Sequence, residues 1–92
     1  MIAAISNELV RREGRLLYVL LDAAEENGRL KDTAYETPWL EAKAGVQAKD
    51  DYAADADLYF DLLLGLAASG KLSGSWIEQR WLTIRSRIAA GD

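Results

Sequence analysis

The chain has 92 residues, of which half are apolar, and it contains neither histidine nor cysteine. This length fits one domain with a single core. Without cysteine, disulfides and thiolate metal sites are excluded, and without histidine the most common general base is missing. We therefore expect no enzyme, no metal and no cofactor, and we find no pattern for a small-molecule substrate. The formal charge of −4 opposes general attraction to nucleic acid or an anionic membrane, although a local basic patch can outweigh it.

A soluble, cytoplasmic protein is expected. The first residues, Met1 to Ile5, lack the basic start and cleavage pattern of a signal peptide, and no apolar run approaches the roughly 18 residues of a membrane helix. The chain has one proline, and it shows no internal repeat or low-complexity segment. Residues 1–92 are therefore expected to form a single unit, in which residues 1–6 are free to fray.

A first helix is predicted from about Asn7 to Glu26. Its apolar residues recur at steps of three and four, which is the helical period; they are Leu9, Leu16, Leu17, Leu20, Leu21 and Ala24. Gly14 costs this helix about 1 kcal/mol relative to alanine. The pair Asn27-Gly28 predicts its end, because both residues tolerate the left-handed conformation that follows a last turn.

Two further helices are expected after a short connection. The alternating residues from Arg29 to Thr33 predict an edge strand. Proline after threonine at Thr37-Pro38 then predicts a brief helix that ends near Gly45. The third helix is expected to begin between Lys49 and Asp57 and to end at Ser69, with Gly70 as its cap.

The last quarter of the chain predicts a β-hairpin. Lys71 to Trp76 is read as a strand start and a turn, and Glu78 to Thr83 is read as the returning strand. Thr83 could also cap a short last helix that runs through Ile88 to Gly91. The expected fold class is thus α+β and mainly helical, with three helices and a C-terminal hairpin.

This order of elements resembles a winged helix-turn-helix domain. Three segments resemble small winged-helix proteins of Mu-like phages and prophages: Arg11 to Leu17, Asp57 to Leu72, and Arg80 to Thr83. The resemblance implies a small non-catalytic module that binds DNA in transcription regulation, with the hairpin as its wing. The stretch from Ala44 to Asp57 departs from the pattern, since it is longer than a tight turn.

The third helix is acidic where a DNA reader needs arginine or lysine. Five aspartates and no basic residue lie between Asp50 and Gly70, and Asp57 and Asp61 share one face because they are four residues apart. These acids either complement the positive end of the helix and keep the surface soluble, or they repel or mimic DNA. Their spacing lacks the pattern of a calcium loop.

Apolar and basic residues define two kinds of candidate site. The candidates for a protein interface are Trp39, Tyr59, Leu64, Trp76 and Trp81, which serve either as core lids or as interface anchors. The candidates for nucleic-acid binding are Arg80, Arg85 and Arg87 near the hairpin, and Arg11, Arg12 and Arg15 on the first helix. These arginines are alternatively a solvated surface that forms ordinary ion pairs with glutamates such as Glu13.

Two hypotheses remain open. In the first, the chain is a winged-helix module that binds DNA weakly, and in a salt-dependent way, through the basic residues. In the second, it is an acidic module that dimerises or docks a protein partner and binds no DNA. The fold resemblance favours the first hypothesis, and the charge distribution of this chain favours the second.

Overall fold

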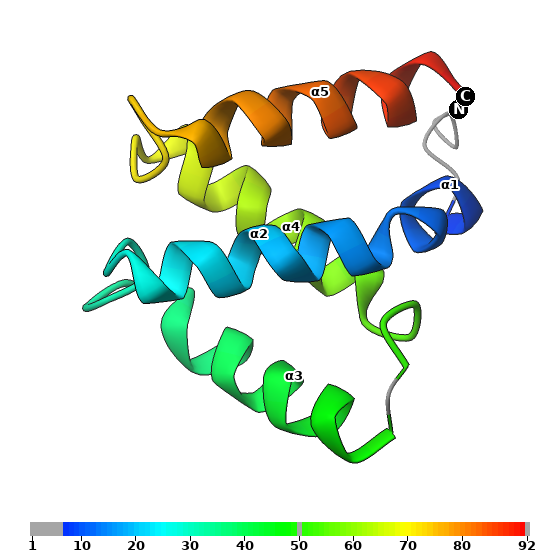
Figure 1. The fold of residues 1–92 in the computed structure, drawn as a ribbon, viewed down its shortest axis with the longest axis horizontal. Helices are drawn as coiled ribbons and strands as arrows, with labels where there is room; N and C mark the ends of the chain where they lie inside the picture. Colours follow the sequence, from blue (N-terminus) through cyan, green and yellow to red (C-terminus); the bar gives the residue numbers. More distant parts are fainter. Residues whose placement is uncertain (1–6, 50, 92) are drawn as a thin grey trace.

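The computed structural model describes residues 7–49 and 51–91. These residues form helices only: α1 (Asn7–Arg12), α2 (Gly14–Glu26), α3 (Glu36–Lys49), α4 (Ala56–Ala68) and α5 (Trp76–Ala90) (Figure 1). No strand occurs within these two ranges. The predicted α+β fold class, with its winged helix-turn-helix architecture, is therefore wrong, and the protein is a helical globule.

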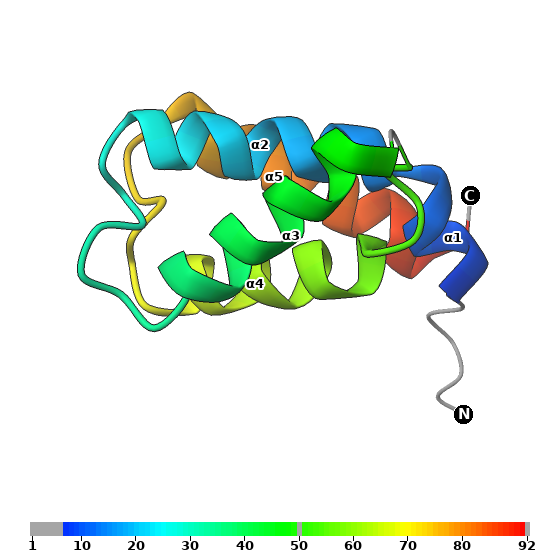
Figure 2. The same cartoon turned by 90° about the horizontal axis from the view of Figure 1, so that it is seen from below.

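The helices are arranged around the contact between α2 and α4. α2 packs most extensively on α4 and also on α5, while α1 contacts α4. In Figure 1, α2 lies in front of α4, with α5 above it and α3 below. Both α2 and α4 run from right to left in that view, and α3 and α5 run back. Figure 2 shows that α2 and α4 lie on opposite sides of the molecule.

The predicted first helix is present, with one interruption. Its range is divided between α1 and α2, which are separated at Glu13. A Cβ atom on Gly14 would lie 2.5 Å from the backbone oxygen of Tyr52, which is closer than any real contact of this kind. The absence of a side chain at Gly14 therefore lets the segment that precedes α4 pack directly on the helix backbone.

Two helix ends agree with their glycine signals. After α2, Gly28 has a φ of 73°, and the N–H of Arg29 donates to the carbonyl of Ala24 at 2.9 Å. After α4, Gly70 has a φ of 80°, and the N–H of Lys71 donates to the carbonyl of Leu66 at 2.9 Å. Both ends close in the same way, because glycine adopts a positive φ without steric cost. The start of α4 at Ala56 also lies inside the predicted window.

The predicted edge strand at residues 29–33 is wrong. The chain turns there instead, and Asp32 has a φ of 63°. Thr33 holds the turn, because its hydroxyl donates to the carbonyl of Leu30 at 2.7 Å and accepts from the N–H of Tyr35 at 3.2 Å. The second predicted helix is also too short, since α3 begins at Glu36 and continues past Gly45.

The two loops at this end of the bundle are joined by Arg29. Its Nη1 atom donates to the carbonyl oxygen of Lys71 at 2.8 Å, across 42 positions of sequence. This bond connects the turn after α2 to the turn after α4, which lie side by side in both views (Figures 1 and 2).

The predicted hairpin is wrong as well, because α5 occupies its residues. Ser75 caps this helix, since its hydroxyl accepts from the N–H of Glu78 at 3.3 Å and donates to the carbonyl of Leu72 at 2.7 Å. Thr83 is no cap, as its hydroxyl donates to the carbonyl of Gln79 inside the helix at 3.1 Å. The alternative prediction, a last helix capped by Thr83 that runs to Gly91, is confirmed at its end, since Gly91 is the C-cap of α5. It is wrong at its start, since α5 begins at Trp76.

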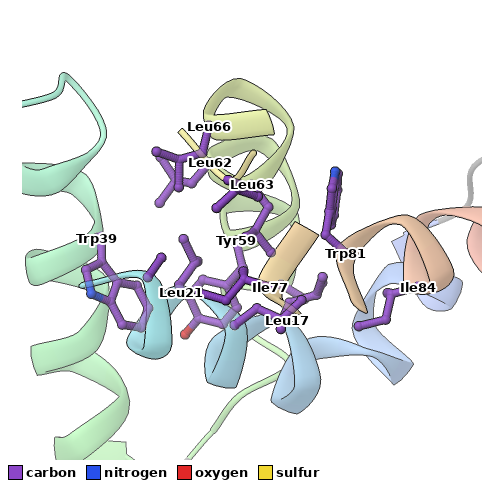
Figure 3. Packing of buried hydrophobic residues seen from close by; sticks show 14 of the residues in the cluster. Leu17, Leu21, Trp39, Tyr59, Leu62, Leu63, Leu66, Ile77, Trp81 and Ile84 are labelled. Carbon is purple, nitrogen blue, oxygen red and sulfur yellow. The ribbon is translucent and has the colours of Figure 1, made fainter. Parts of the chain in front are cut away.

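The core is built from one apolar stripe of each packed helix. α2 supplies Leu17, Leu20, Leu21 and Ala24; α4 supplies Tyr59, Leu62, Leu63 and Leu66; and α5 supplies Ile77, Trp81, Ile84 and Ile88. Together with Trp39 of α3 they belong to one buried cluster, and Figure 3 shows Leu21 and Tyr59 between Trp39 on one side and Trp81 on the other. A fully buried leucine or isoleucine contributes about 1.5–3 kcal/mol through removal of its surface from water. The buried stripes of α2, α4 and α5 therefore determine which side of each of these helices faces solvent.

Candidate interaction surfaces

Three of the five predicted interface residues lie in the core. Trp39, Tyr59 and Trp81 are 0% exposed, so they present no area to a partner and are removed as interface candidates. The other two reach solvent, with Leu64 at 37% and Trp76 at 56% exposure. The sequence could not separate these groups, because tryptophan and tyrosine occur both in cores and at interfaces.

Trp39 has a structural role that its sequence position did not show. Its Nε1 atom donates to the Glu25 carboxylate at 2.7 Å. Lys43 Nζ lies 3.1 Å from that carboxylate and 3.1 Å from Asp22. The hydrogen bond from Trp39, followed by that from Lys43, lowers the pKa of Glu25, and the bond to Asp22 contributes most to raising the pKa of Lys43. The group thus attaches α3 to α2.

Tyr59 and Trp81 carry polar atoms into the core. Among the residues that the structure describes, the hydroxyl of Tyr59 and the Nε1 atom of Trp81 have no hydrogen-bond partner. The Tyr59 ring lies edge-on to Tyr18 at 5.9 Å and to Trp39 at 6.0 Å. Burial, with a smaller effect of Asp55, raises the pKa of Tyr59 to about 12. Tyr59 is therefore neutral at physiological pH and packs as a core aromatic.

The predicted arginines do not form one basic patch. Arg80 and Arg87 lie on one flank of α5, since they are seven residues apart, whereas Arg85 lies on the other flank of the buried stripe. Arg87 Nη2 bonds Glu13 at 2.9 Å, which is the ordinary ion pair considered as an alternative. Arg15 lies over the Tyr52 ring, 5.6 Å from its centroid. Arg11 and Arg12 are exposed on α1. A wing that carries three converging arginines is thus not present.

A mixed apolar and basic surface forms instead on the outer side of α2 and the adjoining flank of α5, with Arg15 at its edge beside Tyr52. It comprises Arg15, Leu16, Val19, Trp76 and Arg80, and we name it the α2–α5 face. Leu16, Val19 and Trp76 are 44%, 47% and 56% exposed, and the two arginines are exposed as well. Leu16 belongs to the apolar repeat that predicted the first helix, but it lies outside the buried stripe of α2.

The core stripes and one ion pair bring these residues to the same side. The buried stripe of α2 faces α4, so the opposite side of α2, with Arg15 and Val19, faces outward. The bond between Arg87 and Glu13 shows which flank of α5 borders the α1–α2 helix. Trp76 and Arg80 share that flank, because they precede Arg87 by eleven and seven residues. The sequence contained no signal for this pairing of helices.

A second surface lies on the opposite side of the molecule. Asp57, Asp61, Leu64 and Ala68 are all exposed on α4. Asp57 and Asp61 share one face, as their spacing predicted, Leu64 and Ala68 continue it, and we name the four residues the α4 stripe. The neighbouring Gly65 is covered by the ring of Tyr35. Since α2 and α4 pack through their buried stripes, their outer sides point in opposite directions (Figure 2).

Several kinds of site are absent from the described ranges, 7–49 and 51–91. No pocket occurs there, and no three acidic side chains gather as a metal site. None of the helices in these ranges has both the length and the apolar character needed to cross a membrane. Comparisons with protein-family models, with curated proteins and with solved structures find no match for this chain.

Proposed function

We propose that this protein is a small non-enzymatic interaction module that binds a protein partner through the α2–α5 face. The observation that carries the proposal is the exposure of Leu16, Val19 and Trp76 on one side of the molecule. Single exposed apolar residues are common on soluble proteins, but several of them on one face, with a tryptophan among them, are typical of an interaction surface.

The charges on this face indicate the chemistry of the partner. Arg15 and Arg80 accompany the apolar side chains, and neither has an ion-pair partner within the described part of the chain. Complementary charge favours a partner with carboxylates beside apolar residues. An amphipathic acidic helix has this composition, and it would lie along α2 with its apolar stripe against Leu16 and Val19.

The same charges support a protein partner over DNA. Affinity for DNA requires several cations that contact phosphates together. Here Arg85 lies on the other flank of α5, Arg87 is paired with Glu13, and the chain carries a net charge of −4. A regulator that binds DNA through these arginines is the weaker hypothesis, and it is included in the test.

The emission of Trp76 provides the test. Trp39 and Trp81 are fully buried, so a fluorescence change on binding reports mainly on Trp76. The probe is a designed helix of about 14 residues, roughly 21 Å long, with leucine on one stripe and glutamate beside it. A helix with lysine in place of glutamate is the control probe. We expect the acidic helix to bind and to shift the Trp76 emission to shorter wavelength, and the basic helix not to bind.

Matched variants locate the surface. Leu16→Glu places an acid on the α2–α5 face, whereas Leu40→Glu makes the same change on α3 at equal exposure, 44% in both cases. The proposal expects only Leu16→Glu to weaken binding of the acidic helix, by at least tenfold. Equal effects of the two substitutions, or binding of the basic helix, would refute it. Saturable, salt-sensitive binding of labelled duplex DNA that Arg80→Ala abolishes would favour the DNA hypothesis instead.

A further inference from the structure

The α4 stripe has the composition that the α2–α5 face requires. Asp57 and Asp61 provide two carboxylates, and Leu64 and Ala68 continue the same side of the helix with apolar surface. All four side chains are exposed, and no basic residue lies in this segment of the chain. Each molecule therefore carries both an apolar and basic face and, on its other side, an apolar and acidic stripe.

The order of the residues fixes one direction of pairing. On α2, Arg15 precedes Val19 toward the C-terminus; on α4, Asp61 precedes Leu64. Along the helix axes, Arg15 and Val19 are about 6 Å apart and Asp61 and Leu64 are about 4.5 Å apart. When the two helices run parallel, Asp61 can therefore meet Arg15 while Leu64 meets Val19. In an antiparallel arrangement, Asp61 would instead lie against Val19.

We infer that the α4 stripe of one copy docks on the α2–α5 face of a second copy, with α4 parallel to α2. This inference rests on the proposed function and names a partner for the same face. Trp76 lies at the start of α5, beside the C-terminal end of α2 (Figure 1). The apolar end of the stripe, Leu64 and Ala68, would therefore cover Val19 and Trp76.

The assembly that follows is an open chain. The two surfaces lie on opposite sides of the molecule, and α2 and α4 run in the same direction within one copy (Figures 1 and 2). Successive copies are then related by an approximate translation, and a contact between two different surfaces of this kind does not close on itself. A stable contact buries about 800 Å² per partner, a minor part of the 5412 Å² surface of the chain, so both surfaces can be occupied at once.

Sedimentation velocity on the full chain tests this inference. As the concentration rises from roughly 10 µM to roughly 1 mM, which corresponds to moderate affinity, the mean sedimentation coefficient is expected to pass the dimer value. High salt should reduce this association, because exposed charges are screened. A monomer throughout this range would overturn the inference.

Two variants that each block one surface provide the sharper experiment. Val19→Glu blocks the α2–α5 face, and Asp61→Arg blocks the α4 stripe. Each variant alone should associate at least tenfold more weakly than the unchanged chain. An equimolar mixture should form a one-to-one dimer and nothing larger, because the intact stripe of the first fits the intact face of the second. Ser86→Arg, an exposed change on α5 away from the α4 stripe, is the control that should leave assembly unaltered.

The alternative results are distinct. If assembly stops at the dimer and Asp61→Arg does not weaken it, the contact is a two-fold one and the inference is overturned. The inference is also overturned if the mixture stays monomeric while circular dichroism shows that both variants are folded. The proposed function is judged separately on Asp61→Arg, whose α2–α5 face is intact. If this variant binds the designed acidic helix while the unchanged chain remains monomeric, the docking face stands and self-association fails; if it does not bind the helix, the proposed function itself fails.

Discussion

Alanine substitutions at three helical glycines should give three different results, although the local change is the same. In a helix interior, alanine in place of glycine raises the free energy of unfolding by about 1 kcal/mol. At Gly45 of α3, an added Cβ meets no atom within 4 Å, so Gly45→Ala should give this full gain. For a domain of this size, the melting temperature would rise by about 4–8 °C.

At Gly14 the sign reverses. The new Cβ would lie 2.5 Å from the Tyr52 backbone oxygen and 3.3 Å from the Cβ of Ala56. A backbone atom cannot move without displacing its segment, and overpacking of this kind costs about 1–3 kcal/mol. Because the obstacle is backbone, the upper part of this range applies, about 2–3 kcal/mol. After a helix gain of at most about 1 kcal/mol, Gly14→Ala should lower the free energy of unfolding by about 1–2 kcal/mol.

Gly65 is the intermediate case, because the obstacle is a side chain. Its added Cβ would lie 2.5 Å from Cε1 of Tyr35, and that ring can rotate away at the loss of its packing on α4. Gly65→Ala should therefore stay within about 1 kcal/mol of the unchanged protein. In a Tyr35→Ala background the obstacle is gone, and the same substitution should then stabilise by about 1 kcal/mol.

Urea unfolding followed by far-ultraviolet circular dichroism measures all of these changes under the same conditions. The reasoning would be refuted if Gly14→Ala stabilised the protein as much as Gly45→Ala. It would also be refuted if the effect of Gly65→Ala were equal with and without the Tyr35 ring, since the two substitutions should not be additive.

Three further predictions concern the N-cap of α5, the loss of folding stability in acid and the loss of folding stability in alkali. Ser75→Ala removes the cap of α5 and should lower the free energy of unfolding by about 1 kcal/mol in urea titrations, whereas Ser73→Ala, in the preceding turn, should have little effect. The pKa of Glu25 is lowered in the folded state, mainly by Trp39, so its stabilisation is present above its ordinary pKa and is lost as the pH falls through the lowered value; Glu25→Gln should flatten the decline of the urea midpoint in acid. The pKa of Tyr59 is raised to about 12, mainly by burial, so stability should fall as the pH rises from about 10 toward that value. Tyr59→Phe should reduce this alkaline loss, and near neutral pH it should raise the unfolding free energy by about 1 kcal/mol, because it removes a buried hydroxyl that has no partner among the described residues.

The helices whose signals are local could be predicted from the sequence. Leucines at helical steps located the α1–α2 helix and α4, and the glycines at 28 and 70 located their ends. The helix α5 was missed because isoleucine, threonine and tryptophan are favoured in strands. Two signals for it were nevertheless present: the capping pair Ser75 and Glu78, and a buried stripe that begins at Ile77 and repeats at helical spacing. Tertiary packing here outweighs β-propensity.

The interaction surfaces depended on contacts that no local pattern reveals. The exposed side of α4 could be predicted, since Asp57 and Asp61 mark it. The exposure of Leu16 could not, because Leu16 and Leu17 are equally suitable for a buried stripe, and only the position of α4 selects Leu17. The contact between Arg87 and Glu13, across 74 positions, likewise joins two residues that no local pattern pairs.

The bond from Arg29 to the carbonyl of Lys71 has a consequence for proteolysis. Trypsin attacks the carbonyl carbon of a lysine or arginine residue, and Lys31 and Lys71 are both exposed lysines in turns. The carbonyl oxygen of Lys71 is held by the guanidinium of Arg29, so a protease must first open this loop pair before the peptide fits its active site. Limited digestion of the native protein should therefore cut after Lys31 before it cuts after Lys71, so that the bond from Arg29 decides which of these two turns is opened first.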